Sequence, residues 1–180
     1  MIGKATNPPN PDLIATSMKE AGADFMFIGK GGLVLLGYSG STLDIDITAA
    51  LGEVNARKLI QAVKLMGFNL DEAMERKLLT GVDFIQLQDG PFLFDIVFAP
   101  DGIKSFEDAK SRCVVEGPYI VMNPRDILAS KVAANRPKDL VDIPLIKLFI
   151  REYEKAHAAE LLSAHETALK NTAARQVKEQ

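Results

Sequence analysis

Residues 29–46, which read GKGGLVLLGYSGSTLDID, decide the fold. The stretch opens with a glycine-rich turn, and its leucines then need a buried face, which predicts a short helix over residues 31–36. It ends in alternating apolar and acidic residues, and this period of two continues to Ile47. Residues 43–47 are therefore predicted to form a half-buried strand with Asp44 and Asp46 on one face.

The two aspartates of this strand are predicted to share a cation. Residues two apart on one strand face have Cβ atoms about 6–7 Å apart, so unpaired carboxylates at Asp44 and Asp46 repel each other and have raised pKa values. A bound divalent cation removes that cost, and oxygen ligands of this kind suit Mg²⁺ or Mn²⁺.

A third acid, Asp95, is the only charged residue of the apolar run 92–98, FLFDIVF. A lone carboxylate in a hydrophobic strand is costly unless it is paired or ligated. If this strand lies beside residues 43–47, three carboxylates converge at one edge of the sheet. That arrangement lets two metal ions clamp the attacking and leaving oxygens of a phosphoryl transfer.

The rest of the chain predicts helices interleaved with short strands. The Asp89-Gly90 turn predicts a hairpin, and Asn123-Pro124 predicts the start of a helix. Pro144 falls inside a predicted helix and is expected to kink or split it. The expected helices are 11–20, 53–66, 71–79, 105–111, 124–135 and 138–154, and the expected strands are 25–28, 83–88, 92–98, 113–115 and 119–122.

The glycine-rich turn, the two aspartates of residues 43–47 and the later Asp95 follow one another in the chain as in the nucleotidyltransferase superfamily with the DNA polymerase β-like fold, which this sequence resembles. Within it they are most similar to the branch of abortive-infection-type nucleotidyltransferase toxins and related bacterial proteins. The resemblance runs from about residue 25 to residue 149. The matched residues are the turn Gly29-Lys30, Thr42, Asp44, Asp46, Asp95, and the segments 126–131 (DILASK) and 136–142 (RPKDLVD).

The resemblance implies an α+β fold, with a small mixed β-sheet flanked by helices and further helices at the C-terminus. It implies a nucleotidyltransferase core in residues 1–136 and a C-terminal helical extension in residues 137–180. That extension is expected to belong to the same compact domain up to about residue 155. The tail beyond it offers a helix through which a homodimer or an antitoxin partner could bind.

The resemblance also implies an enzyme. It would transfer a nucleoside monophosphate from an NTP to an acceptor hydroxyl and release pyrophosphate; the acceptor would be an RNA 3′ end, a protein or a small molecule. The implied catalytic and metal-binding residues are Asp44, Asp46 and Asp95, with Mg²⁺ or Mn²⁺ as cofactor, and Asp95 also helps to deprotonate the acceptor. The implied nucleotide-binding residues are Gly29, Lys30, Thr42, Lys131, Arg136 and Lys138.

Two departures from the family pattern keep a second hypothesis open. Lys30 stands where the turn usually has Gly or Ser, and Gly40 stands where the loop often has Arg. The alternative is a catalytically inactive nucleotidyltransferase-fold binding protein, such as one component of a toxin–antitoxin pair. A weaker third reading is an aminoglycoside-modifying nucleotidyltransferase, which would need a second helical domain to close over its acceptor.

The cationic residues have structural alternatives as well. Arg136 and Lys138 either bind phosphate or form ion pairs at a helix end with Asp139 and Asp142. Lys131 either contacts the triphosphate as a point charge or is a surface lysine.

Composition narrows the class of protein. The chain has 180 residues, of which 47% are hydrophobic and 25% charged, and this describes one ordinary globular domain. Cys113 is the only cysteine, which excludes an internal disulfide framework and a cysteine-based zinc site. A net charge of −3 argues against a general nucleic-acid coat and a polybasic membrane binder. The sequence predicts no membrane span and no signal peptide, so we expect a cytoplasmic protein.

Overall fold

The computed structural model describes residues 7–40, 42 and 44–178, and the side chains within this range up to residue 158. The fold is α+β, as the sequence predicts. The helices are α1 (Pro11–Ala21), α2 (Gly29–Leu35), α3 (Glu53–Leu65), α4 (Glu72–Thr80), α5 (Phe106–Lys110), α6 (Pro124–Ala134) and α7 (Pro137–Lys178). The strands are β1 (Phe25–Ile28), β2 (Asp46–Ala49), β3 (Phe84–Leu87), β4 (Phe94–Val97), β5 (Val114–Glu116) and β6 (Tyr119–Val121).

The strands form one mixed sheet in the order β3-β4-β2-β1-β6-β5. Strand β2 is antiparallel to β1 and parallel to β4, so it brings two distant parts of the chain side by side. Its register with β4 places Asp46 directly opposite Asp95 and Ile47 opposite Ile96. The expected meeting of the two acidic strands is therefore confirmed.

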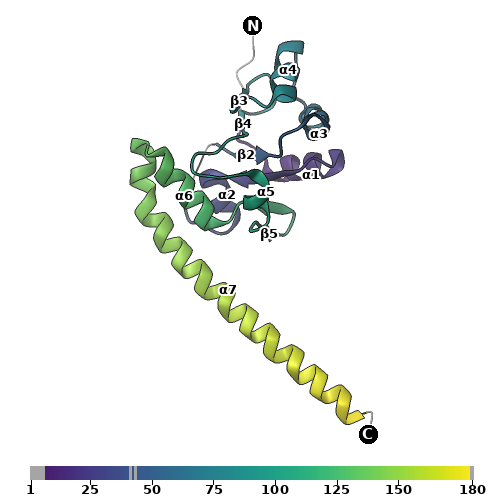
Figure 1. Ribbon diagram of the computed structural model, residues 1–180, viewed down its shortest axis with the longest axis vertical. Helices are drawn as coiled ribbons and strands as arrows, with labels where there is room; N and C mark the ends of the chain where they lie inside the picture. The colour runs from purple at the N-terminus through teal and green to yellow at the C-terminus, as the bar shows by residue number, and fades with distance from the viewer. Residues whose placement is uncertain (1–6, 41, 43, 179–180) are drawn as a thin grey trace.

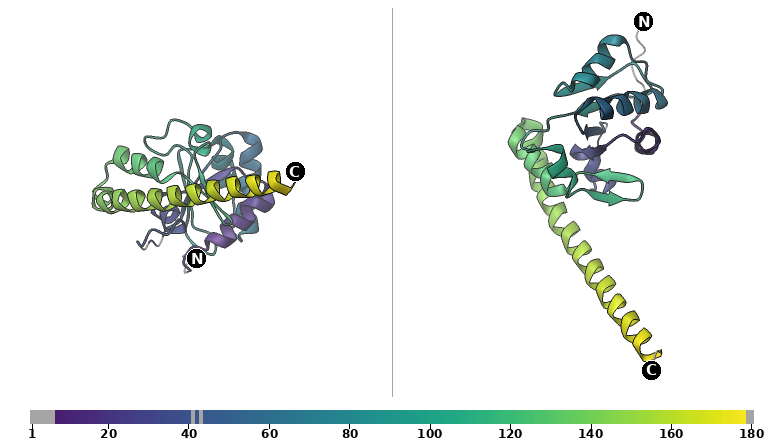
Figure 2. Two further views of the ribbon diagram at one scale, coloured as in Figure 1. Left: turned by 90° about the horizontal axis from the view of Figure 1, so that it is seen from below. Right: turned by 45° about the vertical axis from the view of Figure 1, so that its right-hand side comes forward.

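Helices cover both sides of this sheet (Figure 1). Helices α1 and α3 lie on one side, and α6 with the start of α7 lies on the other, as the turned view in Figure 2 also shows. Period-two alternation in β4 explains the layering, because Phe94 and Ile96 are fully buried while Asp95 is only half-buried. The core is completed by Ile14 and Met18 of α1 and Leu59 and Val63 of α3.

The predicted caps form. Asn123 accepts a hydrogen bond from the backbone N–H of Arg125 at the start of α6, and Ser105 accepts one from Asp108 at the start of α5. Of the two effects expected of Pro144, a kink or a split, the split does not occur, because α7 continues unbroken through it. Figure 1 shows the later part of α7 extending away from the sheet. No described helix is both long and apolar enough to cross a membrane.

The bounds predicted for the acidic strand are wrong. Strand β2 begins at Asp46 and ends at Ala49, whereas the prediction began at Leu43, which lies outside the described residues. The cause is its neighbour: β1 ends at Ile28, opposite Asp46, because Gly29 with φ 65° turns the chain into α2. Asp44 therefore has no β1 residue opposite it and lies in the loop before the strand.

Candidate active site

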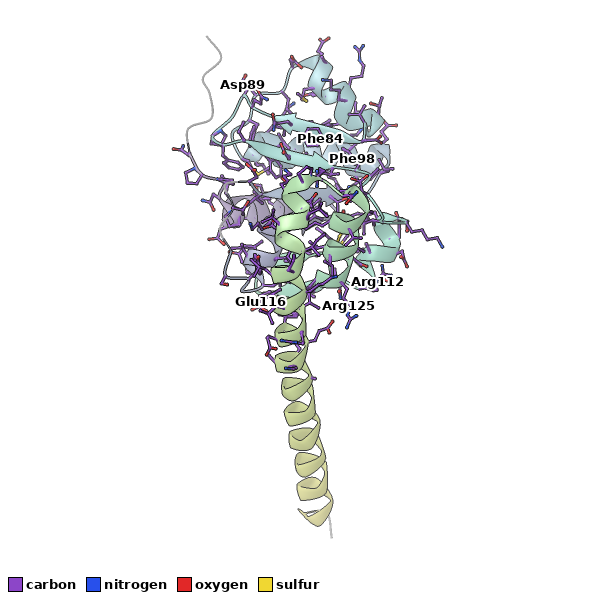
Figure 3. The ribbon with its side chains drawn as sticks, turned by 90° about the vertical axis from the view of Figure 1, so that its left-hand side faces the viewer. Phe84, Asp89, Phe98, Arg112, Glu116 and Arg125 are labelled. Atoms are coloured by element: carbon purple, nitrogen blue, oxygen red, sulfur yellow. The ribbon has the colours of Figure 1, made fainter. Side chains whose placement is uncertain are left out.

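One cleft of about 910 Å³ is lined by every residue that the sequence assigns to catalysis or nucleotide binding. These residues come from α2, the loop before β2, the strands β2 and β4, the helices α6 and α7, and the link between these two helices. Figure 3 faces α6 and α7, with Phe84 and Phe98 labelled near the upper ends of these helices. The residues brought together are Gly29, Lys30, Thr42, Asp44, Asp46, Asp95, Lys131, Arg136 and Lys138.

Asp46 and Asp95 form the acidic centre of the cleft. Burial first, and then the negative charges of Asp95 and Asp44, raise the pKa of Asp46 to about 6 against the opposing effect of Lys138 and Lys131. Burial also raises the pKa of Asp95, whose Oδ1 is buried without a hydrogen-bond partner among the described residues. Two adjacent, poorly solvated carboxylates with one orphaned oxygen are costly for the free protein.

Asp44 lies in the same cleft but is exposed. Thr42 fixes its backbone, because the Thr42 Oγ1 accepts a hydrogen bond from the Asp44 N–H at 3.2 Å and donates one to the Asp44 carbonyl at 3.0 Å. Thr42 thus shapes the loop that carries the first carboxylate. The charge of Asp44 reaches both of the other acids, since it raises the pKa of Asp46 and of Asp95.

The glycine-rich turn packs directly against these acids. A Cβ atom on Gly29 would lie 3.0 Å from the Asp46 Oδ2, and one on Gly31 would lie 3.0 Å from the backbone oxygen of Asp44. Only glycine avoids both contacts, and Gly29 also has the positive φ of 65° that favours glycine. This close approach explains why the turn and the acidic motif occur together in the sequence.

A cationic wall faces the acids and consists of Lys131 on α6, Lys138 on α7 and Arg136 between these helices. Lys131 donates to Asp139 at 2.8 Å and Arg136 donates to the same carboxylate at 2.6 Å. Asp139 is fully buried; burial opposes its ionisation, but the two hydrogen bonds outweigh that effect and lower its pKa. The structural alternative for Arg136, an ion pair at the helix end, is therefore observed.

Lys138 differs from the other cations of this wall. It has no carboxylate within 4.0 Å among the residues that the structure describes, yet its charge lowers the pKa of both Asp46 and Asp95. Lys138 therefore faces the acidic centre without an ion-pair partner of its own. An incoming anion would meet its charge unneutralised.

Sequence reasoning missed part of the lining. Asp83, Phe84 and Asp101 also line the cleft, and Phe84 is 55% exposed. Asp83 precedes β3 and Asp101 lies in the turn after β4, where acidic residues are ordinary. Their position beside the active centre depends on the sheet order, so no local signal could have found them.

The acidic centre fits a divalent cation in its donor chemistry. The carboxylate oxygens of Asp46 and Asp95 are hard ligands, and a cation would satisfy the orphaned Oδ1 and remove the charge repulsion. Within the described ranges, however, no three His, Cys, Asp or Glu side chains are arranged to hold a metal ion as they stand. The expected convergence of three carboxylates is thus seen for two, with the third in the adjoining loop.

The raised pKa of Asp46 predicts stability that falls as the pH rises. The ordinary value is 3.8 and the folded value about 6, so between these pH values the unfolded chain ionises first and the free energy of unfolding decreases. Asp46→Asn is expected to raise that free energy by about 1–3 kcal/mol at pH 8 and to change it little at pH 4. Urea denaturation at the two pH values measures the difference, and an Asp46→Asn protein less stable than wild type at pH 8 would contradict it.

Divalent cations are expected to reverse this cost. We expect Mg²⁺ at about ten times its dissociation constant to raise the melting temperature at pH 8 by about 2–5 °C. The reason is that Mg²⁺ binds the acidic centre of the folded protein and not the unfolded chain. The double variant Asp46→Asn/Asp95→Asn should show no such rise. Calorimetric scans with MgCl₂ against NaCl of equal ionic strength test this, and equal shifts in both proteins would contradict it.

Comparisons with known proteins identify the fold. No family model matches the chain, and neither does any curated protein. The crystal structure of ANT(2″)-Ia in complex with adenylyl-2″-tobramycin matches with a TM-score of 0.52 and 19% identity, over 82% of this chain and 92% of that one. The solution structure of the antibiotic-resistance factor ANT(2″)-Ia matches with a TM-score of 0.48 and 16% identity, over 86% and 95%. The first match shows that this chain has the nucleotidyltransferase fold.

Proposed function

We propose that this chain, with its nucleotidyltransferase fold, is a metal-dependent enzyme that transfers a nucleoside monophosphate from an NTP to an acceptor hydroxyl. One observation carries the proposal: Asp46 and Asp95 face each other across β2 and β4 in a cleft that also holds Asp44 and a cationic wall. Acids and cations in one cleft suit a metal-bound polyphosphate, because the acids can bind the metal ion and the cations can contact the negatively charged phosphates.

In this proposal the acids hold the metal and prepare the acceptor. Asp44, Asp46 and Asp95 would bind Mg²⁺ or Mn²⁺, which supplies charge stabilisation at the α-phosphate when bound. The acceptor hydroxyl oxygen bonds to the α-phosphorus, the bond from that phosphorus to the bridging oxygen breaks, and pyrophosphate leaves. The hydroxyl proton passes to Asp95, which lies opposite Asp46 in the same cleft.

The polyphosphate would lie against the cations. Lys138 offers an unneutralised charge beside the acidic centre, and Lys131 is held in place by Asp139 with its amine at the cleft. The Gly29–Lys30 turn adds a backbone that can come close to phosphate oxygens, because no side chain at Gly29 stands in the way. Arg136, already bound to Asp139, would act mainly by orienting that carboxylate.

The acceptor is proposed to be a small cationic molecule. Asp83 and Asp101 are exposed acids of the cleft, and Phe84 beside them offers an exposed apolar ring. The negative charges of Asp83 and Asp101 would repel an RNA end, which is a polyanion, and would attract the amines of a cationic acceptor. The solved structure with adenylyl-2″-tobramycin spans a chain of which 92% is matched here, so the size of this chain does not argue against such an acceptor.

Pyrophosphate release tests the proposed reaction. We expect release from NTPs with Mg²⁺ when an amino sugar, which carries both amines and hydroxyls, is added as acceptor. The release should exceed that with total RNA or a protein extract, and Asp44→Ala/Asp46→Ala should give none. NTP binding by calorimetry without release in any mixture would favour the inactive binding protein instead. An absence of NTP binding in the presence of Mg²⁺ and Mn²⁺ would contradict the nucleotide site itself.

A further inference from the structure

Lys30 forms an ion pair with Asp142, which lies far from it in the sequence. Its Nζ donates a hydrogen bond to the Asp142 Oδ1 at 2.9 Å, which joins α2 to α7 across 112 positions. The two side chains are 28% and 19% exposed, so the pair is half-buried and open to the cleft that both residues line. The hydrogen bond that Lys30 donates to Asp142 raises the pKa of Lys30, so this amine stays charged at neutral pH.

Asp142 lies closer to Lys30 than to Lys131, so Lys30 is its main ion-pair partner. The Lys131 Nζ lies 3.8 Å from the Asp142 Oδ2 but 2.8 Å from Asp139, which is its hydrogen-bond partner. Asp139 in turn also binds Arg136. Replacing Asp142 would therefore leave the buried group of Lys131, Asp139 and Arg136 intact and would release Lys30.

We propose that Asp142 is an affinity-determining residue of the nucleotide site, whose carboxylate occupies Lys30 until the polyphosphate of the nucleotide replaces it. This inference rests on the proposed function. Carboxylate and phosphate compete for the same ammonium group, and a partly exposed ion pair is weak enough to exchange. A polyphosphate carries several charges where Asp142 carries one, so it is the stronger partner for Lys30 once it enters the cleft.

The exchange predicts that removing the competing carboxylate tightens anion binding. We expect Asp142→Asn to bind inorganic tripolyphosphate about 3- to 10-fold more tightly than wild type at low ionic strength. Lys30→Met should bind it more weakly than wild type. In the Lys30→Met background, Asp142→Asn should give only the small gain that loss of any nearby negative charge produces, which Asp101→Asn measures as the matched control.

Calorimetric titration of the four proteins of this cycle decides the matter. An Asp142→Asn gain that is equal with and without Lys30 would overturn the inference, as would weaker binding by Asp142→Asn or no binding by wild type and Asp142→Asn alike. Tripolyphosphate binding requires neither turnover nor an acceptor. If the four proteins bind as predicted but no transfer is detected, the proposed reaction is refuted and the role of Asp142 stands. If transfer is detected but the four proteins do not bind tripolyphosphate as predicted, only the role of Asp142 is refuted.

Discussion

Asp46→Asn is expected to lower the rate of nucleotidyl transfer by about 10²–10³-fold, the loss typical of removing one electrostatic contact to a transition state. Asp46 lies opposite Asp95 in the sheet, and its carboxylate lies beside the glycine turn, at the centre of the proposed metal site. The rate of pyrophosphate release with saturating NTP and acceptor measures the effect.

The matched control is Asp89→Asn, which removes an exposed acid outside the cleft. It should keep the rate within about threefold of wild type, because a single exposed charge is largely screened. Since Asp46→Asn is also expected to be more stable than wild type at pH 8, its loss of activity cannot come from unfolding. Similar losses in the two variants would show that the acidic centre has no special role.

Asp139→Ala is expected to lower the free energy of unfolding by about 3–5 kcal/mol, because it leaves the buried amine of Lys131 without its hydrogen-bonded carboxylate. Asp139 is fully buried and Lys131, which it binds, is only 11% exposed. Arg136 is 56% exposed and can return to water, so the cost arises mainly at Lys131. Urea denaturation at pH 7 gives the difference.

Glu53→Ala provides the comparison for this second effect. Glu53 pairs with Arg57 one helical turn away, but both side chains are more than 60% exposed, so its removal should cost less than about 1 kcal/mol. The double variant Lys131→Met/Asp139→Leu should recover much of the lost stability, because it removes both charges together. An Asp139→Ala cost no larger than that of Glu53→Ala would contradict the account of this buried pair.

The two roles of the acidic centre oppose each other. The carboxylates of Asp46 and Asp95 destabilise the metal-free protein through burial and mutual repulsion, and the same features make them suited to a divalent cation. A residue that costs stability while lining a cleft is expected at a functional site. The measured stability of Asp46→Asn therefore bears on function as well as on folding.

The fold was predictable because its decisive signals are local. Alternation in β4, the hairpin turn at Asp89-Gly90 and the cap at Asn123 each depend on neighbouring residues, and they predict the elements that the structure has. The residues of the proposed site were predictable through their order along the chain. Their meeting in one cleft follows once β2 and β4 are adjacent.

What the sequence did not predict depends on tertiary structure. The start of β2 at Asp46 is set by the end of β1, so alternation alone placed Asp44 wrongly on the strand. The pair between Lys30 and Asp142 requires α7 to lie across the cleft from α2, and the acids Asp83 and Asp101 reach it only through the sheet order. Period and propensity carry no information about such contacts.

The transfer of labelled phosphorus tests the central claim most directly. Wild-type protein is incubated with Mg²⁺, a cationic acceptor and an NTP labelled at either the α- or the γ-phosphorus, and the acceptor is then separated and counted. We expect label on the acceptor from the α-labelled NTP only, with stoichiometric release of pyrophosphate. Label from the γ-phosphorus would identify a phosphotransferase instead, and an unlabelled acceptor of every class would contradict nucleotidyl transfer by this chain.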